Sequence, residues 1–195
     1  KKLTPGFFFL SLGVTITLLT TLISLINVIF ETLNKAYPDI LSTTYQFGYN
    51  SYELESMRGA LATLIIAFPV YIVLSYFWKK STSSNEFSLT NEILKKWMIY
   101  LIIFVITVTC LVDFIVLVRY FVSGEITVRF ILKVISILFI GSLVGLYYLP
   151  YNFKFNLKKS KDFFFCIIAI IVFLLTIIYS FTIIGTPSKQ RSLRI

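Results

Sequence analysis

Five long apolar segments are the feature of this sequence that most restricts its fold. They cover residues 7–30, 59–78, 97–118, 126–149 and 163–184. Each has roughly 19 to 24 residues, and about 20 helical residues cross the hydrocarbon core of a bilayer. Transmembrane strands would alternate polar and apolar residues, and these segments do not. The sequence therefore predicts an all-α integral membrane bundle of five transmembrane helices, with residues 1–195 as a single domain.

The composition supports this class and excludes two others. The 195 residues are 57% hydrophobic and 14% charged, whereas about a quarter of the residues of a soluble domain are charged. The chain is also too apolar to be intrinsically disordered. Its net charge of +9 is expected to set membrane orientation rather than to bind nucleic acid. We therefore expect the lipid bilayer as a partner, and no nucleic acid.

The sequence offers little for catalysis or metal binding. It has no histidine, which is the commonest metal ligand and general base. Cys110 and Cys166 lie inside apolar segments and do not have the spacing of a metal site or a disulfide framework. A buried lysine could form a Schiff base with a retinal-like cofactor, but no other feature supports that role. We predict that the protein is not an enzyme and that it holds no metal and no cofactor.

The distribution of basic residues predicts the orientation. On the side of the N-terminus and the second and fourth loops there are ten: Lys1, Lys2, Lys79, Lys80, Lys95, Lys96, Lys154, Lys158, Lys159 and Lys161. The other side has seven: Lys35, Arg58, Arg119, Arg129, Lys189, Arg191 and Arg194. Because the side richer in Lys and Arg usually faces the cytoplasm, we predict the N-terminus inside and the C-terminus outside.

Several residues predict details of packing. Trp78 and Trp97, beside lysines at the ends of apolar segments, are typical of membrane-interface anchors. Pro69 in the second segment predicts a kink, and Gly141 with Gly145 predicts a close helix contact. The first loop, from Glu31 to Arg58, is rich in tyrosine. We interpret it as a short segment that caps the bundle; a lid over a ligand is the alternative.

Two charged residues lie where a bilayer disfavours them. Asp113 is in the third apolar segment and Lys133 is in the fourth. If the turn between these segments is centred at residues 122–124, each lies about nine residues from it, or about 14 Å in a helix. The two residues would then share one depth on adjacent antiparallel helices. The sequence therefore predicts that Asp113 and Lys133 can pair.

Polar residues near this pair recur at helical spacing. In the fourth segment they form one predicted seam: Glu125, Arg129, Lys133 and Ser136. The first segment has a secondary stripe: Thr17, Thr20, Ser24, Asn27 and Glu31. Residues three and four apart share a helix face, so both sets are expected to face other helices. Arg58 is a candidate partner of Glu31.

Two interpretations of these charges remain open. In the first, Asp113–Lys133, Glu31–Arg58 and Glu125–Arg129 are buried ion pairs that fix the register of the helices. In the second, the seam lines a hydrated path or an ion site, and Asp113 is its titratable group.

Several stretches of this chain resemble the DUF5671 family. They are residues 57–69, 96–101, 111–113, 123–148 and the tail at 185–191, of which Ser-Gly-Glu-Ile-Thr-Val-Arg-Phe-Ile-Leu-Lys at 123–133 is the most specific. The resemblance runs over most of the chain, from about Leu10 to Arg194. It implies a prokaryotic multi-pass protein of the cell membrane without an assigned activity. The family pattern falls on these positions: Arg58, Pro69, Trp97, Asp113, Gly124, Glu125, Arg129 and Lys133.

These observations lead to one functional hypothesis and one alternative. The hypothesis is a small channel or transporter-like protein that handles ions or protons through the charged seam, acting as a homo-oligomer. The alternative is a structural or assembly subunit of a membrane protein complex, in which the charges fix helix register.

Overall fold

The structure is a computed structural model that describes residues 5–37, 51–82, 89–124, 127–148 and 160–184. These residues form five helices and no strand: α1 (Pro5–Ala36), α3 (Ser51–Thr82), α4 (Leu89–Ser123), α5 (Val128–Tyr148) and α6 (Ser160–Ile184). All five are long and apolar enough to cross a membrane. The predicted all-α fold with five spanning helices is therefore confirmed.

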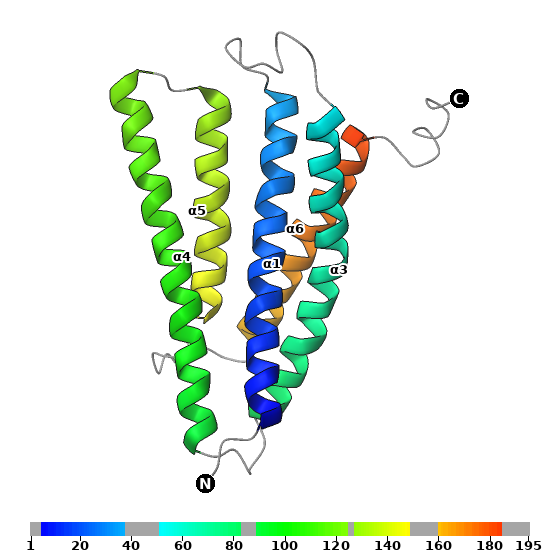
Figure 1. The fold of residues 1–195 in the computed structure, drawn as a ribbon, viewed down its shortest axis with the longest axis vertical. Helices are drawn as coiled ribbons and strands as arrows, with labels where there is room; N and C mark the ends of the chain where they lie inside the picture. Colours follow the sequence, from blue (N-terminus) through cyan, green and yellow to red (C-terminus); the bar gives the residue numbers. More distant parts are fainter. Residues whose placement is uncertain (1–4, 38–50, 83–88, 125–126, 149–159, 185–195) are drawn as a thin grey trace, which may run out of the picture.

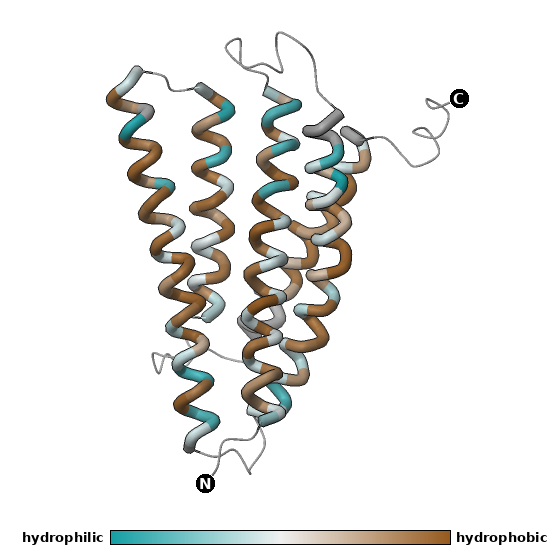
Figure 2. The backbone as a smooth tube through the Cα atoms, viewed as in Figure 1, coloured by the Kyte–Doolittle hydropathy of each residue, from teal (hydrophilic) through white to brown (hydrophobic). Residues whose placement is uncertain are grey.

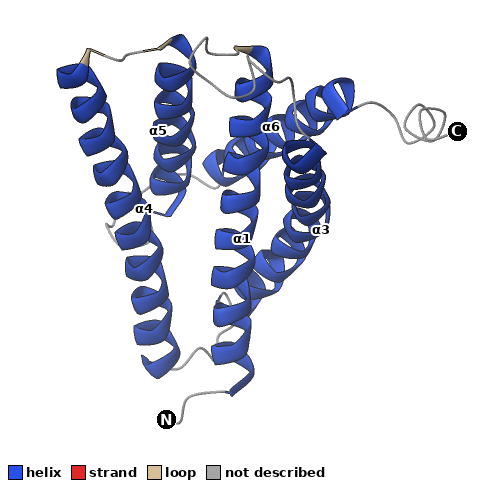
Figure 3. Ribbon diagram, turned by 45° about the horizontal axis from the view of Figure 1, so that its top comes forward, coloured by secondary structure: helices blue, strands red, loops and turns tan. Residues whose placement is uncertain are grey.

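Helix α1 lies in the middle of the bundle and contacts the other four helices (Figure 1). On one side of it α4 and α5 form an antiparallel pair, and on the other side lies α3. Helix α6 runs obliquely behind α1 (Figure 3). Successive helices alternate in direction, so the start of α1 and the end of α6 lie at opposite ends of the bundle.

The distribution of hydropathy along the helices is typical of a bundle that lies in a membrane. Apolar residues fill the middle of each helix, and hydrophilic residues gather towards the helix ends (Figure 2). Within the most apolar window of each helix, 39% of the residues of α1 are buried, against 6% in both α4 and α6. The exposed residues of α4 and α6 include Phe104, Phe114 and Leu175. Such a surface is suited to contact with lipid.

Two apolar clusters hold the other helices against α1. In the first, Val14 and Leu18 of α1 pack with Ile99 and Ile102 of α4 and with Tyr148 of α5. In the second, nearer the other end of α1, the buried residues are Leu25, Val28, Leu61, Leu64 and Ile140. Both clusters contain residues of α1, so this central helix is the element against which the other helices pack.

All the helices except α5 extend beyond the predicted apolar segments. Glu31 and Arg58, which the sequence placed at the two ends of the first loop, lie inside α1 and α3. Polar residues at a membrane surface continue a helix readily, so hydropathy marks the spans but not the helix ends. The predicted capping segment or lid falls mainly on residues 38–50, outside the described residues.

The two tryptophans occupy different environments. Trp97 is 73% exposed, as expected of an interface anchor, but Trp78 is only 6% exposed. The Trp78 indole Nε1 donates a hydrogen bond to Ser11 Oγ of α1 at 2.9 Å. The predicted anchor role of Trp78 is therefore wrong, because an indole with a buried hydroxyl acceptor packs stably between helices.

The buried polar residues of α1 differ from the predicted stripe. They are Ser11, Thr15, Thr21 and Ser24, so of the predicted stripe only Ser24 is buried, and Asn27 is exposed. The Thr17 and Thr20 hydroxyls donate to carbonyl oxygens of their own helix, those of Gly13 and Ile16. A hydroxyl satisfied in this way does not need to face another helix.

Pro69 lies inside α3 as predicted. Helix α3 is visibly curved along its length (Figure 3), and a proline removes one backbone hydrogen bond and favours such bending.

Candidate functional site

The turn between α4 and α5 sets the depth of every residue in the predicted seam. Gly124 follows α4 with φ of 69°, and its amide donates to the Phe121 carbonyl at 3.2 Å. This left-handed conformation is the usual glycine cap of a helix C-terminus. At the start of α5, the Phe130 amide donates to Thr127 Oγ1 at 3.3 Å, as in an N-cap. The turn therefore lies between Ser123 and Val128, later in the chain than predicted.

A close contact fixes the register of α4 against α5. A Cβ atom placed on Gly141 would lie 2.9 Å from Cys110 Sγ, which is closer than real Cβ contacts. A side chain at residue 141 would force Cys110 or the helices to shift, so glycine favours this close approach. A Cβ atom at Gly145 would meet nothing within 4 Å. Of the two predicted glycines, Gly141 makes the close helix contact.

This register separates Asp113 from Lys133. With Cys110 opposite Gly141 on antiparallel helices, Asp113 is level with Leu138 rather than with Lys133. Lys133 and Leu138 are five residues apart in α5, or about 7.5 Å along the helix. Among the described residues, Asp113 forms no ion pair, so the predicted pair is not formed. The reason is the later turn, which shifts α5 relative to α4.

The register places Asp113 level with the centre of α5. Leu138 is the central residue of α5, which runs from Val128 to Tyr148. A helix of this length is just long enough to cross a hydrocarbon core, so we expect this level of the bundle to lie inside the bilayer, although Asp113 is past the centre of the longer helix α4. Asp113 Oδ2 is buried there and has no hydrogen-bond partner among the described residues. A carboxyl oxygen without a partner inside a spanning helix requires an explanation.

Lys133 belongs to a different set of charges. Its ammonium nitrogen lies over the ring of Phe30 of α1, 5.0 Å from the centroid. It is also close enough to interact electrostatically with Arg129 and with Glu31 of α1. Glu31 Oε2 in turn accepts a hydrogen bond from Asn34 Nδ2 at 3.4 Å. Lys133 therefore joins α5 to α1 rather than to α4.

Neither of the two other predicted ion pairs, Glu31–Arg58 and Glu125–Arg129, is observed in the described residues. Arg58 pairs with Glu55 of its own helix at 3.5 Å rather than with Glu31. Its Nε atom is buried without a hydrogen-bond partner in the described part of the chain. Glu125 lies outside the described residues, so the predicted Glu125–Arg129 pair does too.

No cluster of three or more His, Cys, Asp or Glu side chains occurs within the five described ranges. Cys110 on α4 and Cys166 on α6 are both free thiols. Asp113 has Cys110 on the preceding turn of its own helix, and the two interact electrostatically. The site around Asp113 therefore offers one carboxyl group and one thiol.

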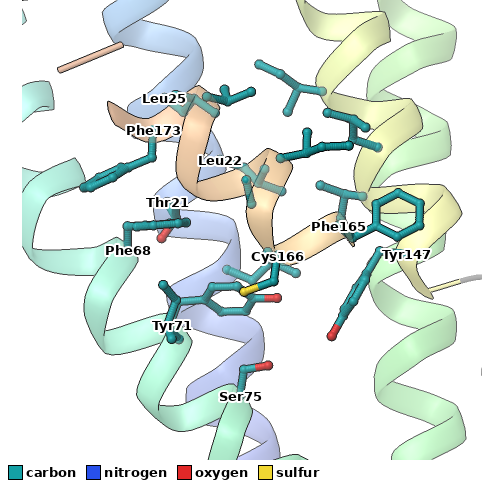
Figure 4. Close-up of a pocket in the computed structure, with 18 of the residues that line it drawn as sticks. Thr21, Leu22, Leu25, Phe68, Tyr71, Ser75, Tyr147, Phe165, Cys166 and Phe173 are labelled. Atoms are coloured by element: carbon teal, nitrogen blue, oxygen red, sulfur yellow. The ribbon is translucent and has the colours of Figure 1, made fainter. Parts of the chain in front are cut away.

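A second feature was not predicted from the sequence. A pocket of about 340 Å³ lies between α1, α3, α5 and α6, and no residue of α4 lines it. Most of its lining is apolar, and it also contains Tyr71 and Ser75 of α3 (Figure 4). Lys79 of α3 belongs to the lining as well. The pocket depends on four helices that are distant in sequence, so no local pattern could have revealed it.

Comparison with known proteins places the chain in a family. The sequence model described as Domain of unknown function (DUF5671) matches residues 8–147. The chain belongs to this family. No curated protein and no solved structure matches it.

In this DUF5671 protein the matched residues run from α1 to the end of α5. They include Asp113, Lys133 and the Cys110–Gly141 contact. Helix α6 and the tail at 185–191 lie beyond the match, so the resemblance predicted for the tail is not part of it. The family description names no activity, and a function must be argued from the site itself.

Proposed function

We propose that this multi-pass membrane protein handles protons, and that Asp113 is the carboxyl group that takes up and releases them. The observation that carries the proposal is the buried Asp113 Oδ2 atom without a hydrogen-bond partner in the described residues. A charged residue at the centre of a spanning helix costs about 2.5–3.5 kcal/mol on insertion scales. Ionisable groups at such positions commonly belong to proton relays or ion pathways.

The chemistry around Asp113 favours a proton over a metal cation. Hard cations take six or more oxygen ligands, and the described residues contain no cluster of acidic, histidine or cysteine side chains. Thr109 is exposed, and its hydroxyl donates to the Val105 carbonyl of its own helix. A single carboxyl group is enough to bind one proton, so proton exchange needs no further ligand.

A route from Asp113 towards one membrane surface is available along α5. Lys133 and Arg129 lie on successive turns between the level of Asp113 and the α4–α5 turn. Glu31 of α1 faces Lys133 from the neighbouring helix. These charged groups would attract water to the outer half of the bundle, and a proton could then exchange between that water and Asp113.

The alternative of a structural or assembly subunit depended on ion pairs between helices. In the described residues Asp113 has no such pair, and Arg58 pairs with Glu55 of its own helix. The register of α4 and α5 is instead explained by the contact between Cys110 and Gly141. Lys133 and Glu31 do interact between helices, but a locking role leaves the Asp113 oxygen unexplained, whereas a functional role accounts for it.

Proton flux into liposomes tests the proposal. The purified protein is reconstituted with a pH-sensitive dye inside, and a potassium gradient with valinomycin drives proton entry. We expect Asp113→Asn to reduce the flux to the level of protein-free liposomes, and Asp113→Glu to retain part of it. Glu92→Gln is the matched control, because Glu92 is an exposed carboxylate at the start of the same helix, paired with Lys96 at 3.1 Å.

Two results would contradict the proposal. One is a wild-type flux no higher than that of protein-free liposomes. The other is an Asp113→Asn variant that conducts like wild type. If Asp113→Asn lowers the melting temperature and neither protein conducts, the structural alternative is favoured.

A further inference from the structure

The pocket between α1, α3, α5 and α6 has an apolar end and a polar end. At the apolar end the lining includes Leu25 of α1 and Phe173 of α6 (Figure 4). The ring of Phe173 stacks on Phe68 of α3, with centroids 4.1 Å apart. No charged residue lines this part of the pocket, so it is suited to a hydrocarbon chain.

The polar end is formed by residues of α3 and α5. The hydroxyl oxygens of Tyr71 and Tyr148 lie 3.0 Å apart and share a hydrogen bond. Ser75 and Tyr147 lie at the same end (Figure 4). These groups can interact with the ester and phosphate oxygens of a lipid but offer nothing to a second hydrocarbon chain.

Lys79 gives the polar end a positive charge. It lines the pocket one turn beyond Ser75, in the last turn of α3. Lys79 and the neighbouring Lys80 are both exposed, but only Lys79 is part of the lining. This end of α3 lies on the side of the membrane that the basic residues predict to be cytoplasmic. Basic pockets between spanning helices on that side bind anionic lipid head groups.

We propose that this pocket binds one anionic phospholipid of the surrounding bilayer. One acyl chain occupies the apolar end between α1, α3 and α6, and the phosphate-containing head group lies at Lys79. The charge complementarity selects an anionic lipid, because a zwitterionic lipid brings its own cation to the same position. The apolar end selects a lipid over a small soluble anion, which would leave that end empty.

This site is separate from the proposed proton site. Helix α4, which carries Asp113, contributes no residue to the pocket lining. The lipid proposal therefore does not depend on proton flux, and either proposal can fail alone.

Native mass spectrometry of the full-length protein in detergent tests the proposal, with phosphatidylglycerol and phosphatidylcholine as the two probes. We expect wild type to retain one phosphatidylglycerol and to bind phosphatidylcholine more weakly. Lys79→Gln should weaken phosphatidylglycerol binding about fivefold, since a lysine near a head group contributes on that scale. Lys80→Gln is the matched control and should bind like wild type.

A second measurement uses Cys166, which lines the pocket (Figure 4). In a Cys110→Ser variant Cys166 is the only thiol, because the sequence has two cysteines. We expect phosphatidylglycerol to slow the reaction of Cys166 with a small maleimide, and phosphatidylcholine to slow it less. Adding Lys79→Gln should remove this difference between the lipids.

The results of these two measurements either overturn or support the lipid proposal. Equal binding of the two lipids by wild type overturns the proposal, as does an equal loss in Lys79→Gln and Lys80→Gln. Maleimide labelling of Cys166 that is unaffected by either lipid also overturns it, because the pocket would then not hold the chain. Selective protection of Cys166 by phosphatidylglycerol, lost with Lys79→Gln alone, supports it.

Discussion

Cys110 of α4 lies directly against Gly141 of α5, at a distance that leaves no room for a Cβ atom on residue 141. This contact determines which residues of the two helices face each other. It places Asp113 level with the centre of α5 and separates it from Lys133. The position of the carboxyl group on which the proposed function rests is therefore set by a glycine and a cysteine.

Gly141→Ala is expected to destabilise the protein. The added Cβ atom would lie 2.9 Å from Cys110 Sγ, so the Cys110 side chain or the helices must shift, and overpacking of this kind costs about 1–3 kcal/mol. Thermal unfolding in detergent measures the effect. Gly145→Ala is the control, because nothing lies within 4 Å of its added Cβ. Equal stability of the two variants would contradict the assigned register.

Asp113→Leu is expected to raise the free energy of unfolding while it removes proton flux. A buried carboxyl oxygen without a partner carries a desolvation penalty of about 1–3 kcal/mol, and leucine removes that group. Unfolding by a denaturing detergent measures the stability change, with Glu92→Gln as the exposed control. A marked loss of stability in Asp113→Leu would mean that the carboxyl group has a structural partner.

Ser11→Ala is expected to destabilise the contact between α1 and α3. Trp78 Nε1 donates to Ser11 Oγ in a buried position, and an unsatisfied buried donor costs about 1–3 kcal/mol. Thr20→Ala is the matched control on the same helix, since the Thr20 hydroxyl bonds to its own backbone at an exposed position. Melting temperatures compare the two. A loss in Thr20→Ala equal to that in Ser11→Ala would show that the interhelical bond contributes nothing.

Gly124→Ala is expected to destabilise the turn between α4 and α5. Gly124 has φ of 69°, and an L-residue in this left-handed conformation costs roughly 1–2 kcal/mol. Gly59→Ala should have the opposite sign, because Gly59 lies inside α3 with open space around it and alanine favours a helix by about 1 kcal/mol over glycine. Chemical denaturation measures both changes. Stabilisation by Gly124→Ala would exclude the glycine cap.

The number and type of the helices could be predicted from the sequence because each apolar segment is long enough to cross a bilayer. The depth of Asp113 could not be predicted from hydropathy. The sequence placed the centre of the turn at residues 122–124, but α4 continues to Ser123 and α5 begins only at Val128. Gly124 and Thr127 are ordinary cap residues, and they would have placed the turn correctly.

Neither the buried face of α1 nor the pocket could be predicted from the sequence. Serine and threonine recur on more than one face of α1, and their hydroxyls bond to the backbone of that helix. Polarity therefore does not indicate which face is buried. The pocket needs α1, α3, α5 and α6 together, and no pattern within one helix records how four helices meet.

The central position of α1 has a consequence for how the protein is assembled in the membrane. Because α1 is synthesised before the other four helices, the element that they all contact is present before any of them emerges. Helix α3 can dock on it at once, whereas the α4–α5 hairpin and α6 must be added to an existing pair. Substitutions on the inner face of α1 should therefore impair biogenesis at its first step, while equivalent substitutions in α6 would leave the earlier steps intact.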